Sequence, residues 1–161
     1  MGCSYLIGNY ISQSYTKRYE QVKELVKVLE TIKSDLCFGL YTLEEIFYRN
    51  TCNDNKIDEF FKNISKELDL HSEIGLKTIL ENNKNILTEK TYLKEKEVDE
   101  LIQLIMTLGK SDIDSQVRMI DLSITNLSQI TKESKEEISK KGMVYQKLAT
   151  ILGIIVAIVL I

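Results

Sequence analysis

Apolar residues recur at every third or fourth position through most of this chain, which is the spacing of one face of an α-helix. The pattern is clear from residue 16 to residue 38, where charged residues occupy the other faces. Its apolar positions are Tyr19, Val22, Leu25, Val26, Leu29, Ile32 and Leu36. The sequence therefore predicts an amphipathic helix here, with one face against a hydrophobic core.

Four more helices are predicted in the middle of the chain. Thr42 followed by Glu45 fits a capping box, and Ser72 is expected to cap a later helix. Apolar residues become sparse between residues 82 and 91, so a frayed end or a turn is expected there. The predicted helices begin near residues 42, 56, 72 and 95, and the last of them ends at Gly109.

The longest periodic segment follows Gly109. Its apolar residues alternate spacings of four and three, which is the a/d seam of a helix pair or bundle. The seam consists of Ile113, Val117, Ile120, Ile124 and Leu127. Because the chain contains no proline, one long helix is expected from residue 112 to residue 161, with any bend at Gly142.

The C-terminal residues 148–161 contain no charged side chain. Fourteen helical residues cover about 21 Å of a hydrocarbon core about 30 Å thick, and counting back to Met143 gives a stretch that can span it. Lysines precede this stretch and no charge follows it, so the positive-inside rule places the preceding residues in the cytoplasm. A buried helix at the end of a soluble core is the alternative. Small residues lie four apart on one face, where another helix could approach: Ala149, Gly153 and Ala157.

The predicted fold class is therefore all-α. We expect an antiparallel bundle of about five or six helices, whose long final helix continues into a C-terminal transmembrane helix. Residues 1–15 form a short apolar segment, a candidate remnant of a membrane helix. Residues 16–141 form the cytoplasmic bundle, and residues 142–161 form the anchor.

Composition and charge argue against several classes of function. A net charge of −3 and a pI near 5.3 do not fit a nucleic-acid-binding protein, which needs clustered basic residues. Three cysteines without a C-x-x-C spacing suggest neither a disulfide framework nor a zinc site, and His71 is the single histidine. No set of residues combines a nucleophile with a base and an orienting acid, so neither an enzyme nor a cofactor is predicted.

The segment from Leu108 to Gln116 is the sharpest local motif. Gly109 can close the preceding helix, and Ser111 or Asp112 can cap the next one. Two interpretations remain open, a purely structural turn and a corner that contacts a partner protein. The candidate contact residues are Leu108, Gly109, Ser111, Asp112 and Gln116.

These segments together resemble the stage III sporulation protein AB family. The resemblance rests on KRYEQVKELVKVLETIKSDLCFGLYTLEEIF in the first helix and the turn after it, on the corner LGKSDIDSQ, and on the C-terminal LGIIVAIVLI. It covers residues 16–161. Members of that family usually open with a complete transmembrane helix and often carry proline after the threonine of the first turn. This chain has only a short apolar segment at its start, and Leu43 follows Thr42.

The family is similar to the cytoplasmic helical domain of the inner-membrane platform protein of type II secretion and type IV pilus machines. The resemblance implies a scaffold in the mother-cell membrane facing the forespore, within a transenvelope channel required for endospore formation. It implies a secretion-type ATPase, sister membrane subunits and the lipid bilayer as partners, and it leaves self-association open. The residues alone also permit a tail-anchored coiled-coil adaptor that recruits a partner helix through the seam.

Overall fold

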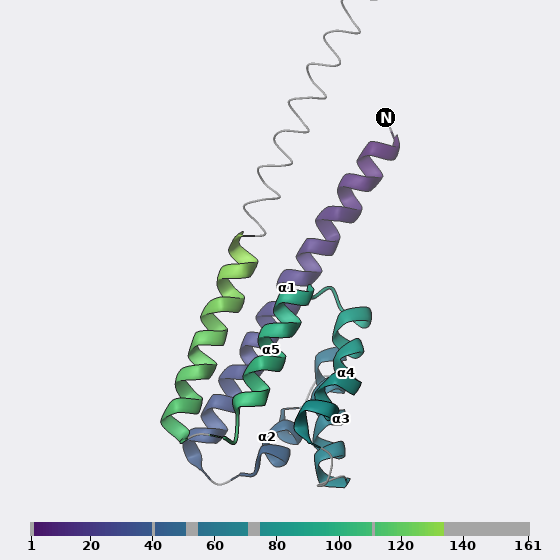
Figure 1. The fold of residues 1–161 in the computed structure, drawn as a ribbon. Helices are drawn as coiled ribbons and strands as arrows, with labels where there is room; N and C mark the ends of the chain where they lie inside the picture. The colour runs from purple at the N-terminus through teal and green to yellow at the C-terminus, as the bar shows by residue number, and fades with distance from the viewer. Residues whose placement is uncertain (1, 40, 51–54, 71–74, 111, 134–161) are drawn as a thin grey trace, which may run out of the picture. The chain divides into compact units, whose positions relative to one another are not determined.

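The computed structural model describes residues 2–39, 41–50, 55–70, 75–110 and 112–133, with side chains described from residue 13 onward. All regular structure in these ranges is helical, which confirms the predicted all-α class (Figure 1). The helices are α1 (Gly2–Phe38), α2 (Leu43–Arg49), α3 (Lys56–Leu70), α4 (Leu76–Lys90), α5 (Glu95–Thr107) and a last helix over residues 113–133. By internal contacts the chain forms two units, Met1–Ser128 and Gln129–Ile161, and the description below concerns the first.

The first helix begins earlier than its amphipathic pattern predicts. The expected start was residue 16, whereas α1 runs without a break from Gly2. Helix formation continues through these residues because none is proline and only two are glycine. Within the described ranges, α1 included, no helix is both long and apolar enough to cross a bilayer. The predicted C-terminal anchor, with Ala149, Gly153 and Ala157, lies outside the described residues.

The predicted cap of α2 is confirmed. Thr42 Oγ1 accepts a hydrogen bond from the Glu45 N–H at 3.3 Å, and the Thr42 N–H donates to Glu45 Oε2 at 2.8 Å. Both donors belong to the first turn, where a helix has no internal partners for them. The threonine therefore starts α2 even without a following proline.

Two expectations for α4 are wrong. Its N-cap is Gly75, not Ser72, and the helix continues through the apolar-poor stretch to Lys90. Asn83 explains the continuation, because this buried amide donates to the Ile79 carbonyl at 2.9 Å and to Glu67 Oε1 at 2.9 Å. A polar residue with its hydrogen bonds satisfied can occupy a core position, and a hydrophobicity pattern does not reveal it.

The last helix uses a seam that differs from the predicted one. Ile120 and Leu127 are fully buried as expected, but Ile113 is 46% exposed. Gln116 and Ser123 are buried instead, and Ser123 Oγ donates to Glu100 Oε1 of α5 at 2.8 Å. The seam therefore packs inside the same chain, whereas the adaptor alternative requires it to be exposed.

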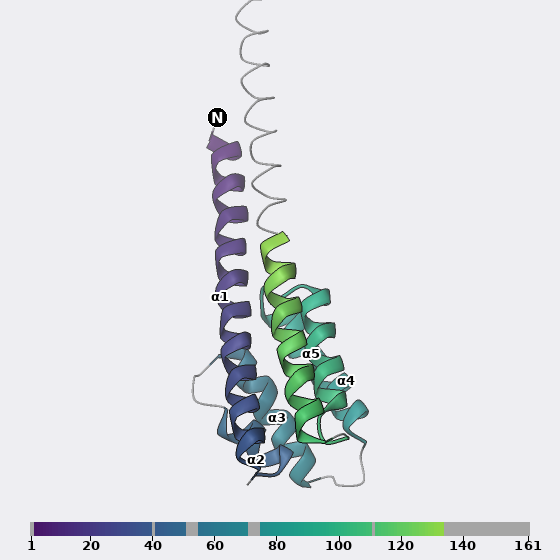
Figure 2. The ribbon, with the colours of Figure 1, turned by 90° about the vertical axis from the view of Figure 1, so that its left-hand side faces the viewer.

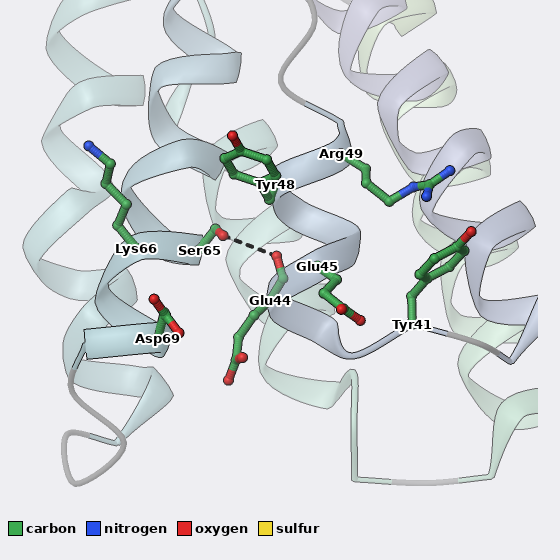
Figure 3. A pocket seen from close by; sticks show the side chains of 8 residues that line it. All are labelled: Tyr41, Glu44, Glu45, Tyr48, Arg49, Ser65, Lys66 and Asp69. Atoms are coloured by element: carbon green, nitrogen blue, oxygen red, sulfur yellow. Dashed lines mark hydrogen bonds between the residues drawn. The ribbon is translucent and has the colours of Figure 1, made fainter.

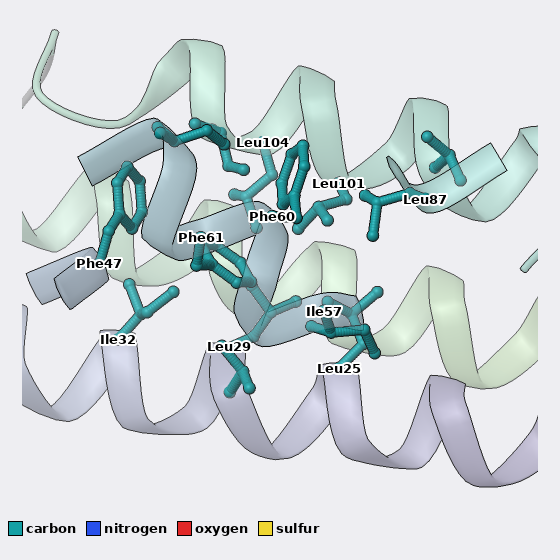
Figure 4. Close-up of a cluster of buried hydrophobic side chains, with 14 of the residues drawn as sticks. Leu25, Leu29, Ile32, Phe47, Ile57, Phe60, Phe61, Leu87, Leu101 and Leu104 are labelled. Atoms are coloured by element: carbon teal, nitrogen blue, oxygen red, sulfur yellow. The ribbon is translucent and has the colours of Figure 1, made fainter. Parts of the chain in front are cut away.

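The core is built around three phenylalanines. Phe47 of α2 and Phe60 of α3 each contact Phe61, with ring centres 5.5 and 5.4 Å apart (Figure 4). Aromatic pairs at these distances favour tilted or edge-on geometry, as found here. The other labelled core residues come from α1, α3, α4 and α5: Leu25, Leu29, Ile32, Ile57, Leu87, Leu101 and Leu104.

A buried ion pair joins the first turns of α5 to α1. Arg18 Nε lies 2.9 Å from Glu97 Oε1, Arg18 Nη2 lies 2.5 Å from the same oxygen, and the two residues are 4% and 0% exposed. The Lys94 N–H donates to Glu97 Oε2 at 2.6 Å, so the carboxylate also serves the N-terminus of α5. Since the far ends of both helices also meet, α1 and α5 run in the same direction, and residues 113–128 run back beside them (Figure 2).

Candidate functional site

The predicted corner lies where the C-terminal ends of α1 and α5 come together. Gly39 ends α1 with φ +64°, and Gly109 follows α5 with φ +78°, a backbone conformation that favours glycine. A Cβ atom on Gly39 would lie 3.9 Å from Ile113 Cδ1, and one on Gly109 would lie 4.0 Å from Leu43 Cδ2. The two turns are therefore neighbours. The sequence predicted each turn separately but not their meeting.

Asp112 caps the last helix, as one of the two interpretations of the corner required. Its Oδ2 accepts from the Ser115 N–H at 3.0 Å, and its Oδ1 accepts from Ser115 Oγ at 2.8 Å. The Ser115 hydroxyl and N–H lower the pKa of Asp112 below its ordinary value. The carboxylate is exposed, so it remains accessible to a partner while it caps.

Two of the other candidate residues are internal parts of the turn. Leu108 is 2% exposed and its N–H donates to the carbonyls of Leu104 and Ile105, which closes α5. Gln116 is 7% exposed, and its Oε1 accepts from the Gly109 N–H at 3.0 Å. The structure thus brings four of the five candidates together, and Ser111 lies outside the described residues.

Exposed apolar side chains accompany this corner, which sequence periodicity did not predict. Phe38, the last residue of α1, is 70% exposed, and Ile113 is 46% exposed. The sequence could have indicated the exposure of Phe38, because this phenylalanine lies off the apolar face of the helix and directly before a helix-ending glycine. Together with the exposed Asp112, these residues form a surface of mixed apolar and acidic character.

A shallow hollow of about 430 Å³ lies beside α2 and α3 (Figure 3). Ser65 Oγ donates to the Glu44 carbonyl at 3.0 Å and joins the two helices there. The Arg49 guanidinium lies over the Tyr41 ring at 4.1 Å. The lining residues are Tyr41, Glu44, Glu45, Tyr48, Arg49, Ser65, Lys66 and Asp69. Three acidic and two basic side chains line it, which suits contact with a polar protein surface.

Chemistry-bearing clusters are sparse in the part of the chain that the structure describes. No group of three or more histidine, cysteine, aspartate or glutamate side chains there could hold a metal ion. His71 lies outside the described residues. The described polar groups at the corner satisfy helix ends and turns, an arrangement suited to holding a shape that other proteins contact.

Comparisons with known proteins place the chain in a family. A family model described as stage III sporulation protein AB matches residues 1–161. A curated protein of that name from Bacillus subtilis (strain 168) is 24% identical over 156 residues, which covers 95% of this chain and 90% of the relative. A solved structure of stage III sporulation protein AB, 22% identical, has a TM-score of 0.66 and covers 76% of this chain and 97% of its own. The resemblance found in the sequence is confirmed, and this chain belongs to the stage III sporulation protein AB family.

Proposed function

We propose that this chain is a membrane-anchored scaffold subunit of a secretion-like channel between mother cell and forespore. The observation that carries the proposal is the match of the whole chain to a family named for a stage of sporulation. The protein acts in the mother-cell membrane facing the forespore, with its helical head in the cytoplasm. It holds other subunits in position and leaves ATP hydrolysis to a secretion-type ATPase.

The packing of the helical head supports a scaffold role. A single core contains side chains from all five helices α1 through α5 and from residues 113–128. A buried ion pair also holds α5 against α1. A scaffold needs such a head because its contact surfaces must keep their shape when partners push or pull on them. The corner at the ends of α1 and α5 offers Phe38, Ile113 and Asp112 to a partner, either the ATPase or a sister membrane subunit.

Anchoring through the C-terminus is tested by deleting residues 148–161. The truncated chain is expected in the soluble fraction after cell breakage, because this stretch supplies the apolar length for a membrane helix. The full chain should resist extraction with alkaline carbonate. A truncated chain that stays in the membrane fraction without partners would refute this anchor.

The corner is tested by replacing Asp112 in two ways. Serine retains an N-cap oxygen, whereas alanine removes both the cap and the carboxylate. If the carboxylate contacts a partner, D112S and D112A both reduce the ATPase or sister subunits that co-purify with the tagged full chain from sporulating cells. The exposed Asp114, two residues away, provides the matched control D114S, which is expected to leave co-purification unchanged.

The outcomes separate the two interpretations of the corner. If D112A loses the partners and D112S retains them, Asp112 acts only as a helix cap. Normal co-purification with both variants, together with normal spore formation, places the contact elsewhere. Failure of the parent chain to co-purify with any membrane subunit would refute the scaffold proposal itself.

A further inference from the structure

Two pairs of tyrosine and lysine side chains lie where the turn between α4 and α5 meets α1. The Lys17 ammonium lies 5.2 Å from the centre of the Tyr92 ring and 3.4 Å from its hydroxyl. The Lys94 ammonium lies 5.6 Å from the centre of the Tyr15 ring. Tyr19, one helical turn after Tyr15, is 54% exposed, and Tyr92 is 41% exposed. We call this set of residues the collar, and it consists of Tyr15, Lys17, Tyr19, Tyr92 and Lys94.

The collar is held rigidly by contacts beneath it. The Tyr92 N–H donates to Gln21 Oε1 of α1 at 2.7 Å. Glu97 accepts from both Arg18 and the Lys94 N–H, so the turn is fixed to α1 on either side of Leu93, which is itself buried. The backbone that carries the collar side chains is therefore held against α1 without a ligand.

The stretches that form the collar are basic in an otherwise acidic chain. Residues 15–21 and 90–97 hold five basic and three acidic side chains, whereas the whole chain has a net charge of −3. One acid among the three, Glu97, is neutralised by Arg18 in the interior. Lys90 pairs with Glu59 at 3.5 Å, which leaves three lysines against Glu20 and Glu95. The collar therefore carries a small excess of lysine beside tyrosine rings, the composition found where proteins meet anionic lipid headgroups.

The collar also lies where α1 enters its uncharged half. The first charged residue of the chain is Lys17, and α1 continues as a helix from there back to Gly2. That uncharged stretch leaves the bundle on the side of the α4–α5 turn, while α2 and the corner lie at the other end (Figures 1 and 2). A helix that changes from uncharged to lysine-bearing beside tyrosines matches the boundary between lipid and water.

Resting on the proposed membrane-anchored function, we propose that the collar binds anionic phospholipid headgroups. The tyrosine rings lie at headgroup depth, and Lys17 and Lys94 neutralise phosphate charge within a Debye length of the surface. Contact of the collar with the headgroups orients the head so that the α4–α5 turn faces the bilayer and the corner with Phe38 points away from it. The head is then oriented by its own surface as well as tethered by an anchor.

Tryptophan fluorescence tests the proposal, because the chain contains no tryptophan of its own. The full chain carrying Y92W is reconstituted into vesicles of phosphatidylcholine and phosphatidylglycerol, with and without a nitroxide on a minor fraction of the headgroups. The matched control is Y48W, because Tyr48 is also exposed, at 62%, but belongs to α2 at the other end. Y92W is expected to lose most of its fluorescence to the nitroxide, and Y48W is expected to keep it.

A second variant and a flotation measurement make the outcomes distinct. Replacing the exposed Lys17 and Lys94 by glutamine in Y92W, or omitting phosphatidylglycerol, should restore most of the fluorescence. A chain that does not float with vesicles would refute the proposed membrane anchoring and the collar together. A chain that floats but shows no quenching of Y92W, or equal quenching of Y48W, would refute the collar and leave the anchoring intact.

Discussion

The buried pair of Arg18 and Glu97 allows a quantitative prediction. E97Q keeps the shape of the side chain but removes the charge that faces a guanidinium only 4% exposed. In Glu97, Arg18 donates to both carboxylate oxygens and the Lys94 N–H donates to Oε2, whereas glutamine offers a single oxygen for all of these donors. Because the guanidinium would stay buried without a counter-charge, E97Q is expected to cost about 3–5 kcal/mol of folding free energy. That is a large share of the roughly 5–15 kcal/mol that stabilises a typical domain.

Urea unfolding of the full chain in detergent, followed by far-ultraviolet circular dichroism, measures this cost. A loss of about 3 kcal/mol lowers the urea midpoint by roughly 1–3 M. The matched control is the double variant R18M/E97Q, which removes both charges, retains an acceptor for the Lys94 N–H and fills the space with an apolar chain. It is expected to be more stable than E97Q by about 1–3 kcal/mol. A loss below about 1 kcal/mol for E97Q, or a double variant less stable than E97Q, would refute the argument that burial makes the pair interdependent.

Three further predictions concern the corner, the core and an acidic side chain on α1. Gly109→Ala is expected to cost about 1–2 kcal/mol in the same urea assay from backbone strain alone, because its Cβ would meet no atom closer than 4.0 Å; an unchanged midpoint would contradict this. Phe61→Ala, at a fully buried site, is expected to cost about 3–5 kcal/mol. Phe38→Ala, at a site 70% exposed, should stay within about 0.5 kcal/mol, and equal losses at the two sites would be inconsistent with the packing. Burial and the nearby Asp58 carboxylate raise the pKa of Glu24 above its ordinary value of 4.5, so the ionised form destabilises the fold at neutral pH. Glu24→Gln should therefore raise the urea midpoint at neutral pH, and this gain should disappear as the pH falls toward 4.5, where Glu24 becomes protonated in the folded chain. A gain that is larger in acid than at neutral pH would contradict the prediction.

Local features of the fold could be predicted from the sequence where residues a few positions apart determine them. The capping box of Thr42 and Glu45 depends on residues three apart, and Gly109 ends α5 because glycine adopts positive φ at little cost. A cap at Ser111 or Asp112 was predicted for the same reason, and Asp112 makes the capping hydrogen bond. The choice between cap and partner contact at Asp112 could not be made, because an exposed carboxylate can do both.

Features that depend on distant residues were missed or misplaced. The predicted fraying of α4 failed because Asn83 finds its second partner on α3, sixteen residues away. The predicted seam failed at Ile113 and gained Ser123, because Glu100 of α5 supplies a hydrogen bond there. The burial of Arg18 was not predicted, because only the packing of α5 against α1 places it beside Glu97.

The amino-acid order by itself determined that this chain is helical, where most of its helices begin and end, and which family it resembles. Those properties arise from spacing and capping within a few residues, so they survive without knowledge of the fold. The tertiary structure alone decided which polar groups enter the core and which two turns share a corner. It also decided that Lys17 and Tyr92, seventy-five residues apart, come into contact. These features depend on which helix faces pack against one another. Close packing and the pairing of buried hydrogen-bonding groups across the whole head determine which faces meet.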